Sequence, residues 1–577
     1  MGIMENGLLA RMFNEIADIL ELDGDKRKFE VRAYRKAAVS IESMQEDVST
    51  LYKERGISGL LDIPGVGKGL ALKIEEYIKT GKMRKYEELK KQYPIDFENL
   101  TRIQGIGAKK AYRLYKELGI RDIESLKKAL QEHRIMELVG FGERSEKEIE
   151  YGLGLLEASR GRILLGVALP EAEKLRDAIL NSGYASEAVI AGSIRRMKET
   201  IGDIDILVSG KESERIMDFV SGMDAVESTI SRGEAKATFW LKAGVSCDIR
   251  FIEARQFGAA LLYFTGSKSH NVKMRQIAIK KGMKLNEYGI FDRDGTVKAA
   301  ETEEKMYRAL GMDYIAPELR EDRGELEAAA AHALPELITI EEIIGDLHVH
   351  SNHSDGMNSV EEMVNAAKAR GLKYVGITDH SKSEYVAHGM DDAKFMKHID
   401  YIEALAEKFD GIRVLVGAEV DILKDGGLDL GNKVLDRLDY AIGSVHTSLG
   451  MDSGSMTERI SKALDSGRID ILGHPTERII NGRRGIEFDL DKIASKAEEN
   501  GVAMEIDSFP ERLDLNDENI IRAHSSGVKF AIDTDSHSTS HFSMMRYGIG
   551  MARRGWLQKD DVINTYGLSR LRGFFDS

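Results

Sequence analysis

The stretch DLHVHSNHSDG, residues 346–356, places three histidines and two aspartates within eleven positions. The chain has 577 residues and 14 histidines, and 11 of these histidines lie after residue 345. His348 and His350 are two positions apart, so their side chains share one face if the stretch forms a strand. Imidazoles and carboxylates gathered in this way indicate a site that uses nitrogen and oxygen ligands.

Short apolar runs that end in a ligand-type residue recur from this stretch to the C-terminus, separated by helical patterning. GDLHVH ends at His350, YVGITDH at His380, VLVGAE at Glu419, YAIGSVH at His446, DILGH at His474, AMEID at Asp507 and FAIDTDSH at His537. Seven strand–helix units with polar groups at the strand ends predict a β/α barrel, whose site lies at the C-terminal mouth.

The candidate metal ligands of this barrel are too many for one ion, so we expect a cluster of two or three. They are His348, His350, Asp355, His380, Glu419, His446, His474, Asp535 and His537. Mixed nitrogen and oxygen ligands favour zinc, manganese or iron over magnesium, and such a cluster can bind phosphate and activate water. Five further histidines lack this placement and are expected at the surface or behind the ligands: His353, His388, His398, His524 and His541.

Paired carboxylates lie in the middle of the chain. In AGSIRRMKETIGDIDILVSG (191–210), Asp203 and Asp205 alternate with isoleucines, so a strand would carry both carboxylates on one side. Asp248 lies in a second strand candidate, WLKAGVSCDIRFI (240–252). Three carboxylates on adjacent strands can hold two magnesium ions that activate a 3′-hydroxyl and neutralise a triphosphate.

A phosphate-binding turn is expected ahead of the first of these strands, at Gly192, Ser193 and Arg196. The ordered set of Gly-Ser, GDxD and a lone strand aspartate resembles that of the beta-type nucleotidyltransferases. This group includes polymerases, poly(A)-adding enzymes and antibiotic-modifying enzymes, so the set predicts the chemistry better than the acceptor.

The stretch YFTGSKSHNVKMRQIAIKKGMKLNEYGIF (263–291) closely resembles the fingers region of family X DNA polymerases. The resemblance implies that Tyr263 and Phe264 lie against the sugar of the incoming nucleotide. It also implies that a backbone turn, which Gly266 allows, excludes a ribose 2′-hydroxyl.

The same resemblance assigns three polar residues of this stretch. Asn271 would contact the minor-groove edge of the incoming nucleotide, and Arg275 the template strand. Lys268 stands where polymerase beta has an acid, and a lysine could hold the nucleotide before the template arrives.

Three segments in the first 150 residues share two spaced glycines: IPGVGKG (63–69), IQGIGAK (103–109) and LVGFGER (138–144). This is the helix-hairpin-helix pattern, in which the amides that open the second helix face a DNA phosphate without reading sequence. The expected DNA-binding residues are Gly65, Gly67, Lys68, Gly105, Gly107, Lys109 and Lys110. The third segment is the weakest, because Glu143 stands where a lysine would help.

Two predicted helices around the first hairpin, FEVRAYRKAAVSIESM (29–44) and LALKIEEYIKTGK (70–82), resemble the lyase domain of polymerase beta. The resemblance implies that Lys73 lies where the Schiff-base lysine would be, with Tyr34 in the same pocket. Gly69 replaces a second lysine of that family. The alternative is that Lys73 only contacts a 5′-phosphate.

A length of 577 residues is too great for one hydrophobic core and suggests roughly three or four domains of about 150 residues each. The single cysteine, Cys247, excludes a disulfide framework and a cysteine-ligated zinc finger. No secretion signal and no apolar run of membrane-spanning length is present, so we expect a cytoplasmic, nucleoid-associated protein. The net charge of −15 does not exclude DNA, because residues 1–150 carry 28 basic and 27 acidic side chains.

The motifs HxH, TDH, GAE, SVH, GHP and DTDSH in residues 345–577 are similar to those of the PHP family, named for polymerase and histidinol phosphatase. All nine ligand positions of that family are occupied. A helical connector, ELEAAAAHALPEL (325–337), is predicted to end at Pro335. The whole chain resembles bacterial and archaeal family X polymerases with a C-terminal PHP domain.

We therefore expect a multidomain chain with α-helical helix-hairpin-helix domains, an α+β nucleotidyltransferase palm with fingers, and a seven-stranded β/α barrel. The expected boundaries are 1–90 for a lyase-like domain, 91–158 for a thumb-like hairpin domain, 159–258 for the palm, 259–320 for the fingers, 321–344 for a linker and 345–577 for the PHP domain.

The sequence predicts a monomeric DNA polymerase that fills short gaps in base excision repair, using gapped or nicked DNA, dNTPs and Mg²⁺. Its barrel, with a Mn²⁺ or Zn²⁺ cluster, would act as a 3′-5′ exonuclease, abasic-site endonuclease or 3′-phosphoesterase. One alternative is a template-independent nucleotidyltransferase fused to a small-molecule phosphatase. Another is a DNA-end binding scaffold with vestigial sites.

Overall fold

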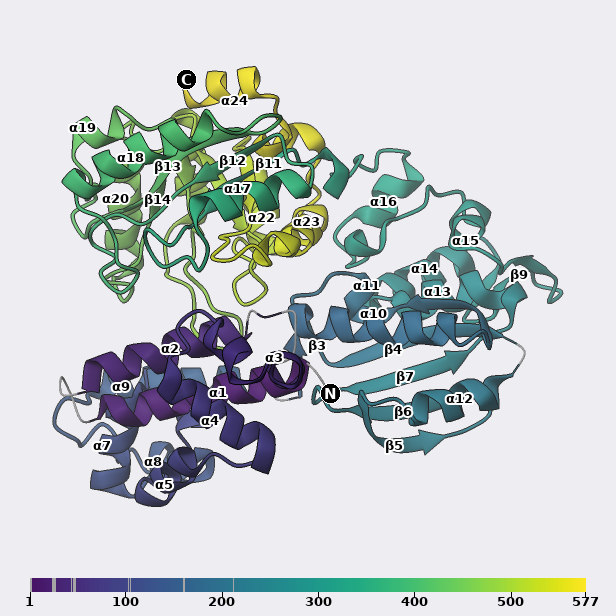
Figure 1. Ribbon diagram of the computed structural model, residues 1–577. Helices are drawn as coiled ribbons and strands as arrows, with labels where there is room; N and C mark the ends of the chain where they lie inside the picture. Colours follow the sequence, from purple (N-terminus) through teal and green to yellow (C-terminus); the bar gives the residue numbers. More distant parts are fainter. Residues whose placement is uncertain are drawn as a thin grey trace. The chain divides into compact units, whose positions relative to one another are not determined.

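The computed structural model describes residues 3–22, 27–42, 44, 48–101, 103, 105–158, 161–210 and 212–576 (Figure 1). The chain forms two compact units. The first comprises Met1–Arg160 with Arg478–Gly485, and the second comprises Gly161–Glu477 with Ile486–Ser577. None of the helices in the described ranges is long and apolar enough to cross a membrane.

The described part of residues 1–160 folds into helices around one apolar core. These are α1 (Ile3–Glu21), α2 (Lys28–Glu42), α3 (Val48–Leu61), α4 (Lys68–Thr80), α5 (Arg84–Gln92), α6 (Phe97–Leu100), α7 (Ala108–Leu118), α8 (Ile123–Gln131) and α9 (Glu143–Ala158). The core includes Phe13 from α1, Ile74 from α4 and Leu114 from α7. The predicted helices at 29–44 and 70–82 correspond to α2 and α4.

Each predicted hairpin turn has the backbone conformation that favours glycine. The first glycine of each hairpin has a positive φ: 80° at Gly65, 88° at Gly105 and 83° at Gly140. A side chain at these positions would be strained. Gly67 and Gly107 are the N-cap residues of α4 and α7, so the helix amides begin directly after each turn.

A five-stranded sheet in the order β2-β4-β7-β6-β5 forms the start of the second unit. Its strands are β2 (Ala185–Ile190), β4 (Asp203–Gly210), β5 (Val226–Arg232), β6 (Lys236–Leu241) and β7 (Ser246–Phe251), accompanied by α10 (Leu165–Asn181), α11 (Gly192–Arg195) and α12 (Ser213–Ser221), and by the short pair β1 (Ile163–Leu164) and β3 (Thr200–Ile201). In β4, Ile204 and Ile206 are buried, and Asp203 and Asp205, which alternate with them, face the other side. β4 and β7 run parallel, and Asp205 is the register partner of Asp248.

The segment after the sheet is largely helical and has its own apolar core. It contains η2 (Ala254–Gln256), α13 (Phe257–Thr265), α14 (Lys268–Lys280), the three-stranded sheet of β8 (Lys284–Asn286), β9 (Gly289–Phe291) and β10 (Val297–Ala299), α15 (Glu303–Ala309), η3 (Pro317–Leu319) and α16 (Glu325–Ala330). Leu326, Ala329 and Leu337 belong to the same core as Met274. The connector predicted from the sequence is therefore packed, and its helix ends at Ala330 instead of at Pro335.

Seven parallel strands in chain order form the C-terminal part. They are β11 (Gly345–Val349), β12 (Tyr374–Ile377), β13 (Arg413–Asp421), β14 (Tyr440–Ser444), β15 (Ile471–Leu472), β16 (Ala503–Asp507) and β17 (Phe530–Asp533). The helices are α17 (Val360–Ala369), α18 (Asp392–Ala406), α19 (Asn432–Leu435), α20 (Ser453–Leu464), α21 (Leu490–Glu499), α22 (Asp517–His524), α23 (Met545–Arg554) and α24 (Leu568–Phe575), with short η4 (Ile340–Glu342), η5 (His541–Met544), η6 (Lys559–Asp561) and η7 (Ile563–Thr565).

The first and last strands of this sheet approach each other, which nearly closes it. Val349 and Ser536 are bridge partners. The His350 amide donates to the Ser536 carbonyl at 2.9 Å, and the Ser536 amide to that of His348 at 3.2 Å. Leu347 and Tyr440 help to fill the interior. The predicted seven-stranded β/α barrel is confirmed.

Candidate active sites

Three carboxylates meet on two adjacent inner strands of the five-stranded sheet. Asp203 and Asp205 lie on β4, and Asp248 lies beside Asp205 on β7. Burial, together with the negative charge of Asp203, raises the pKa of Asp205 to about 7. A divalent cation would relieve the repulsion, so the donor set fits the magnesium ions expected from the sequence.

Asp248 is held by three neighbours that the sequence reasoning did not identify. Thr238 Oγ1 donates to its Oδ1 at 2.7 Å, and Arg250 Nη2 donates to its Oδ2 at 2.9 Å. Lys236 Nζ lies 2.6 Å from the same Oδ2. The sequence could have indicated Arg250, because this residue stands two positions after Asp248 on one strand, which puts both side chains on the same face.

The predicted phosphate-binding turn lies directly against these carboxylates. Gly192 has a φ of 63°, and a Cβ there would lie 2.6 Å from Asp205 Oδ2. Only glycine therefore fits without displacing the carboxylate. The buried Ser193 hydroxyl has no hydrogen-bond partner among the described residues. A buried hydroxyl of this kind is suited to bind a ligand oxygen.

A cavity of about 420 Å³ joins this turn to α13 and α14. Its lining brings together Gly192, Ser193, Arg196, Asp203, Asp205, Tyr263, Phe264, Gly266, Lys268, Asn271 and Arg275, all predicted site residues. Arg162, Lys198 and Thr265 also line it and were not predicted. Five basic side chains face one cavity, so the lining can balance the charge of a triphosphate.

The turn between α13 and α14 is fixed by polar contacts. Asn271 Nδ2 donates to the Tyr263 carbonyl at 2.7 Å. The rings of Tyr263 and Phe264 meet edge to face at 5.1 Å. Gly266 has a φ of 70°, and a Cβ there would lie 3.2 Å from Arg196 Nη1. These contacts hold the backbone where the sequence predicts the wall against a ribose hydroxyl.

At the barrel mouth the nine predicted ligands converge around Glu419. Its carboxylate lies 2.9–3.5 Å from a ring nitrogen of each of five histidines, namely His348, His350, His380, His446 and His474. His350 Nε2 also lies 3.1 Å from Asp535 Oδ1. Asp355 lies 3.3 Å from His537 Nε2 and 3.6 Å from His380 Nε2.

The ring nitrogens of this cluster fit metal ions. Both ring nitrogens of His350 and Nε2 of His348 are buried without a hydrogen bond among the described residues. Donor atoms form several overlapping groups in which all lie within 4.8 Å of one another, such as His350 with Asp355, His380 and His537. Buried imidazole nitrogens without hydrogen bonds, beside carboxylates, are suited to a multinuclear site.

A layer of acidic residues behind the ligands was missed by the sequence reasoning. Glu505 Oε1 lies 2.7 Å from His348 Nδ1 and orients that ring, and its Oε2 accepts the His474 amide at 2.5 Å. Glu477 lies beside His474 and is 3.3 Å from Arg512 Nη1. Glu505 stands in the strand AMEID, where its alternation with Met504 and Ile506 was the available signal.

The five histidines of residues 345–577 that were not predicted as ligands lie apart from the cluster or behind it. His398 is buried, and its Nε2 lies 2.8 Å from Asp379 Oδ2. The centroid of the exposed His353 ring lies 4.3 Å from that of the His398 ring. His541 is buried beside His537. His388 is exposed and His524 is half-buried.

In the first unit, Lys73 and Tyr34 are neighbours. The Lys73 Nζ lies 5.7 Å from the centroid of the Tyr34 ring and donates to the Gly69 carbonyl at 3.1 Å. Burial lowers the pKa of Lys73 and raises that of Tyr34 to about 12. A partly desolvated lysine of this kind can act as a nucleophile. Of the predicted DNA-contacting lysines, Lys68 and Lys109 are exposed, and Lys110 lies over the Phe141 ring.

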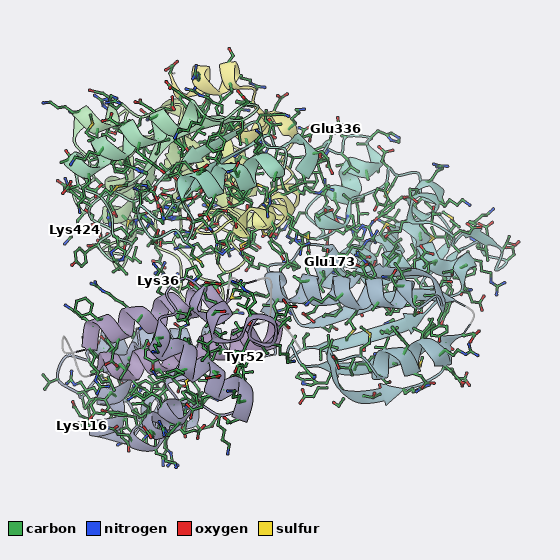
Figure 2. The ribbon with its side chains drawn as sticks, viewed as in Figure 1. Lys36, Tyr52, Lys116, Glu173, Glu336 and Lys424 are labelled. Carbon is green, nitrogen blue, oxygen red and sulfur yellow. The ribbon has the colours of Figure 1, made fainter. Side chains whose placement is uncertain are left out.

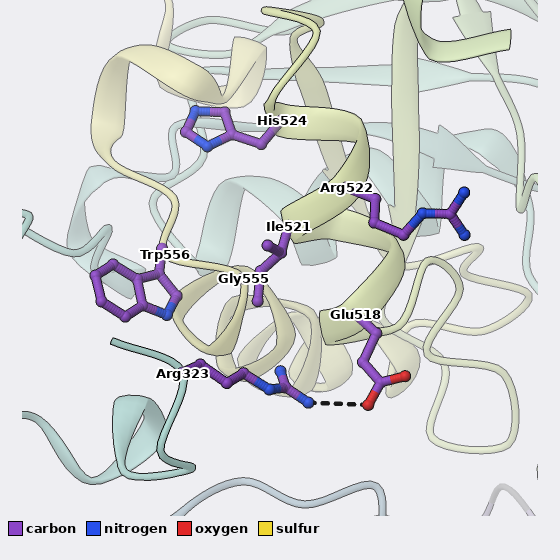
Figure 3. Close-up of a pocket in the computed structure, with 7 residues that line it drawn as sticks. All are labelled: Arg323, Glu518, Ile521, Arg522, His524, Gly555 and Trp556. Atoms are coloured by element: carbon purple, nitrogen blue, oxygen red, sulfur yellow. Dashed lines mark hydrogen bonds and ion pairs between the residues drawn. The ribbon is translucent and has the colours of Figure 1, made fainter. Parts of the chain in front are cut away.

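A second cavity, of about 550 Å³, lies in the second unit at α22 and the residues after α23 (Figure 3). Its lining consists of Arg323, Glu518, Ile521, Arg522, His524, Gly555 and Trp556. None of the predicted catalytic residues or metal ligands lines it, so it is separate from both candidate sites.

Four regions of the chain match known families. Residues 4–83 match the helix-hairpin-helix domain, and residues 57–119 and 97–149 match the SAM-like helix-hairpin-helix tandem. Residues 260–321 match the DNA polymerase beta thumb, a description that applies to the segment we assigned to the fingers. Residues 346–508 match the PHP domain.

Individual proteins are similar to the whole chain or to parts of it. The DNA polymerase/3'-5' exonuclease PolX of Bacillus subtilis (strain 168) is 35% identical over 569 residues, which cover 98% of each chain. A probable phosphatase of Thermoanaerobacter sp. (strain X514) is 27% identical over 39% of this chain and 91% of its own length. DNA polymerase lambda of Rattus norvegicus is 26% identical over 53% of this chain and 54% of its own length. Given the similarity to PolX over almost the entire length, this chain belongs to the family X DNA polymerases with a C-terminal PHP domain.

Proposed function

We propose that this protein is a DNA-directed DNA polymerase that fills short gaps during base excision repair and that its barrel is a 3′-5′ exonuclease. The observation that carries the polymerase function is the single cavity that Asp203 and Asp205 share with the predicted nucleotide-binding residues. A relative 35% identical over nearly the same length is named a DNA polymerase/3'-5' exonuclease, which supports both activities.

In the polymerase site, Asp203, Asp205 and Asp248 would hold Mg²⁺. The ions would lower the pKa of the primer 3′-hydroxyl and neutralise the triphosphate. Ser193 and Arg196 bind the phosphates, and Lys268 adds charge at the start of α14. Because these groups stand in place before the nucleotide arrives, little reorganisation is needed at the moment of transfer.

The sugar and the base of the nucleotide contact the opposite wall of the cavity. Tyr263 and Phe264 exclude the ribose 2′-hydroxyl, and Asn271 contacts the minor-groove edge. Arg275 contacts the template strand. The hairpin residues Gly65, Gly67, Lys68, Gly105, Gly107, Lys109 and Lys110 bind the backbone of gapped or nicked DNA.

In the barrel, the nine ligands would hold two or three Mn²⁺ or Zn²⁺ ions, which supply an activated water for phosphoester cleavage. The chain's own part is to orient the imidazoles. Glu505 fixes the His348 ring, and the buried Glu419 balances the charge of the cluster. Abasic-site cleavage and 3′-phosphoester removal are further reactions for this centre.

Three finer assignments belong to the same proposal. Lys73 forms a Schiff base with a 5′-deoxyribose phosphate, and Tyr34 lines its pocket. The protein acts as a monomer, and it works in the cytoplasm on nucleoid DNA.

A second candidate function for the barrel alone is hydrolysis of a small phosphate ester. It is favoured by the similarity of this part of the chain to a probable phosphatase. In that case the polymerase half would be a template-independent nucleotidyltransferase. A different alternative is that the whole chain is a DNA-end binding scaffold with vestigial sites.

Incorporation on a one-nucleotide gap, with the four dNTPs supplied singly, distinguishes these functions. The proposal predicts incorporation of the nucleotide complementary to the template only. Incorporation regardless of the template indicates the template-independent enzyme, and binding without incorporation indicates the scaffold. In a parallel arm, a 3′-labelled primer loses its terminal nucleotide if the barrel is an exonuclease, whereas a small-molecule phosphatase leaves it intact.

A further inference from the structure

A helix of the barrel, α23, contacts the turn that carries Arg196, on the side of this turn away from the nucleotide cavity. The last residue of α23, Arg554, is only 2% exposed. Its Nη1 donates to the main-chain oxygen of Arg196 at 2.6 Å and to Glu321 Oε1 at 3.0 Å. Arg196 lines the cavity. The barrel thus bonds directly to the turn that is predicted to bind phosphate.

Glu321 joins the two arginines. Arg196 Nε donates to the same Glu321 Oε1 at 3.0 Å, and Arg196 Nη1 donates to the Thr265 carbonyl. Burial raises the pKa of Glu321, but the charges of Arg554 and Arg196 outweigh it and lower that pKa. One ionised oxygen therefore bridges two guanidinium groups in a partly buried place, where such bonds are strong and directional.

The second terminal nitrogen of the Arg554 guanidinium bonds to a neighbouring helix of the barrel, α22. Arg554 Nη2 donates to Asp517 Oδ2 at 2.5 Å. Asp517 also accepts from Arg323 Nη1 at 3.1 Å. Figure 3 shows the second pair of this arginine, in which Arg323 Nη2 donates to Glu518 at 3.0 Å. The Arg554 guanidinium is therefore held between α22 and the Arg196 turn and has little freedom to move.

Close packing adds to these bonds. A Cβ on Gly550, one turn before Arg554, would lie 2.5 Å from Met197 Cε. Arg546, at the start of α23, pairs with Glu173 at 3.0 Å, and Glu173 is labelled on α10 in Figure 2. A shift of α23 would therefore move the turn that carries Arg196.

The guanidinium of Arg196 has a free group for a ligand. Its Nε and Nη1 are used by Glu321 and Thr265, and its Nη2 has no protein partner among the described residues. The direction of that Nη2 is set by the two bonds that Glu321 and Thr265 accept. Arg554 also brings a permanent positive charge behind the cavity.

We propose that Arg554 is a positioning residue for nucleotide binding: through Glu321 and the Arg196 carbonyl it holds Arg196 in the orientation that contacts the triphosphate. Because this role presupposes the polymerase activity proposed above, the test must also measure that activity in the unchanged protein.

The test is steady-state incorporation on a one-nucleotide gap by the full-length protein and its Arg554→Met variant. We expect the KM for the dNTP to rise about tenfold and kcat to change by less than about twofold, since a binding group is misplaced. Arg554→Lys keeps the charge and one bond, so its KM should lie between those of the wild type and Arg554→Met. Cleavage of 3′ ends by the barrel should be unchanged in both variants.

Arg553→Met is the matched control. Arg553 lies on the same helix and donates to Glu318 Oε1 at 2.8 Å and to the Ile338 carbonyl at 2.9 Å, but not to the Arg196 turn. The Arg553→Met change removes contacts of the same kind away from the cavity, so the KM of this variant for the dNTP should equal that of the wild type.

An unchanged KM in folded Arg554→Met would overturn the proposal, and so would an equal rise in Arg553→Met, because that result would indicate general loosening. If Arg554→Met does not fold, Glu321→Gln provides the same test: its KM should rise, and an unchanged KM would overturn the proposal. Absence of incorporation by the wild-type protein would instead defeat the proposed polymerase function.

Discussion

Glu303 is a buried carboxylate that ties the phosphate-binding turn to the helical segment after the sheet. It accepts from Arg195 Nη2 at 2.6 Å and Nη1 at 2.9 Å, and from Arg320 Nη1 at 2.5 Å. Arg320 is fully buried. Replacing Glu303 with glutamine keeps the volume of the side chain but removes its charge, so two arginines lose their shared counter-ion.

The cost of this change follows from the pKa of Glu303. Burial raises this pKa, but the charges of Arg320 and Arg195 outweigh burial and lower it from 4.5 to about 2. This shift corresponds to about 3 kcal/mol of stability at pH 7. A carboxylate with a lowered pKa stabilises the fold fully above its unfolded value of 4.5, and this stabilisation is lost as the pH falls toward 2.

Urea unfolding followed by tryptophan fluorescence measures this effect. The chain's two tryptophans, Trp240 and Trp556, both lie in the second unit, so the signal reports on the unit that contains Glu303. Glu303→Gln should lose about 3 kcal/mol at pH 7 and about 1 kcal/mol at pH 3.

The exposed neighbour provides the control, since Glu304→Gln should change stability by less than about 0.5 kcal/mol at either pH. A loss in Glu303→Gln that is the same at pH 7 and pH 3, or no loss at all, would refute the electrostatic explanation.

Three further changes test individual residues. Asp248→Ala should reduce nucleotide incorporation on gapped DNA by about a thousandfold or more, because Asp203 and Asp205 alone cannot hold two magnesium ions close together; near-wild-type rates would exclude this assignment. Alanine at Tyr263 and Phe264 should narrow the preference for dNTPs over rNTPs in competition assays, and an unchanged ratio would count against the sugar wall. Borohydride should trap the protein on a 5′-deoxyribose phosphate through Lys73, and trapping that persists in Lys73→Ala would rule that lysine out.

The barrel could be predicted from the sequence because its strands end in ligands at a regular interval. The alternation in DLHVH predicted the strand Gly345–Val349, and its two histidines lie 3.4 and 3.5 Å from Glu419. The hairpin turns could also be predicted from the sequence, because a backbone position with positive φ favours glycine, as at Gly65.

The residues that support the sites could not be predicted in the same way. Glu505 and Arg250 are ordinary charges in sequence and gain a role only when strands pair. Arg554 and Arg196 are 358 positions apart, so no local pattern relates them. The connector was predicted to be a linker because alanine-rich sequence carries no signal for its packing partners; the structure buries Glu325 against His270 at 2.7 Å.

The central claim is that one chain carries two chemically separate active sites, with ligands between residues 192 and 248 in one and between residues 348 and 537 in the other. Synthesis and 3′-end cleavage, measured on one gapped substrate, test it most directly. The variant with His348→Ala and His350→Ala should lose cleavage and retain synthesis. The variant with Asp203→Asn and Asp205→Asn should lose synthesis and retain cleavage, with manganese a better activator of cleavage than magnesium. Loss of both activities in either folded variant would contradict the two-site account and indicate a single shared centre.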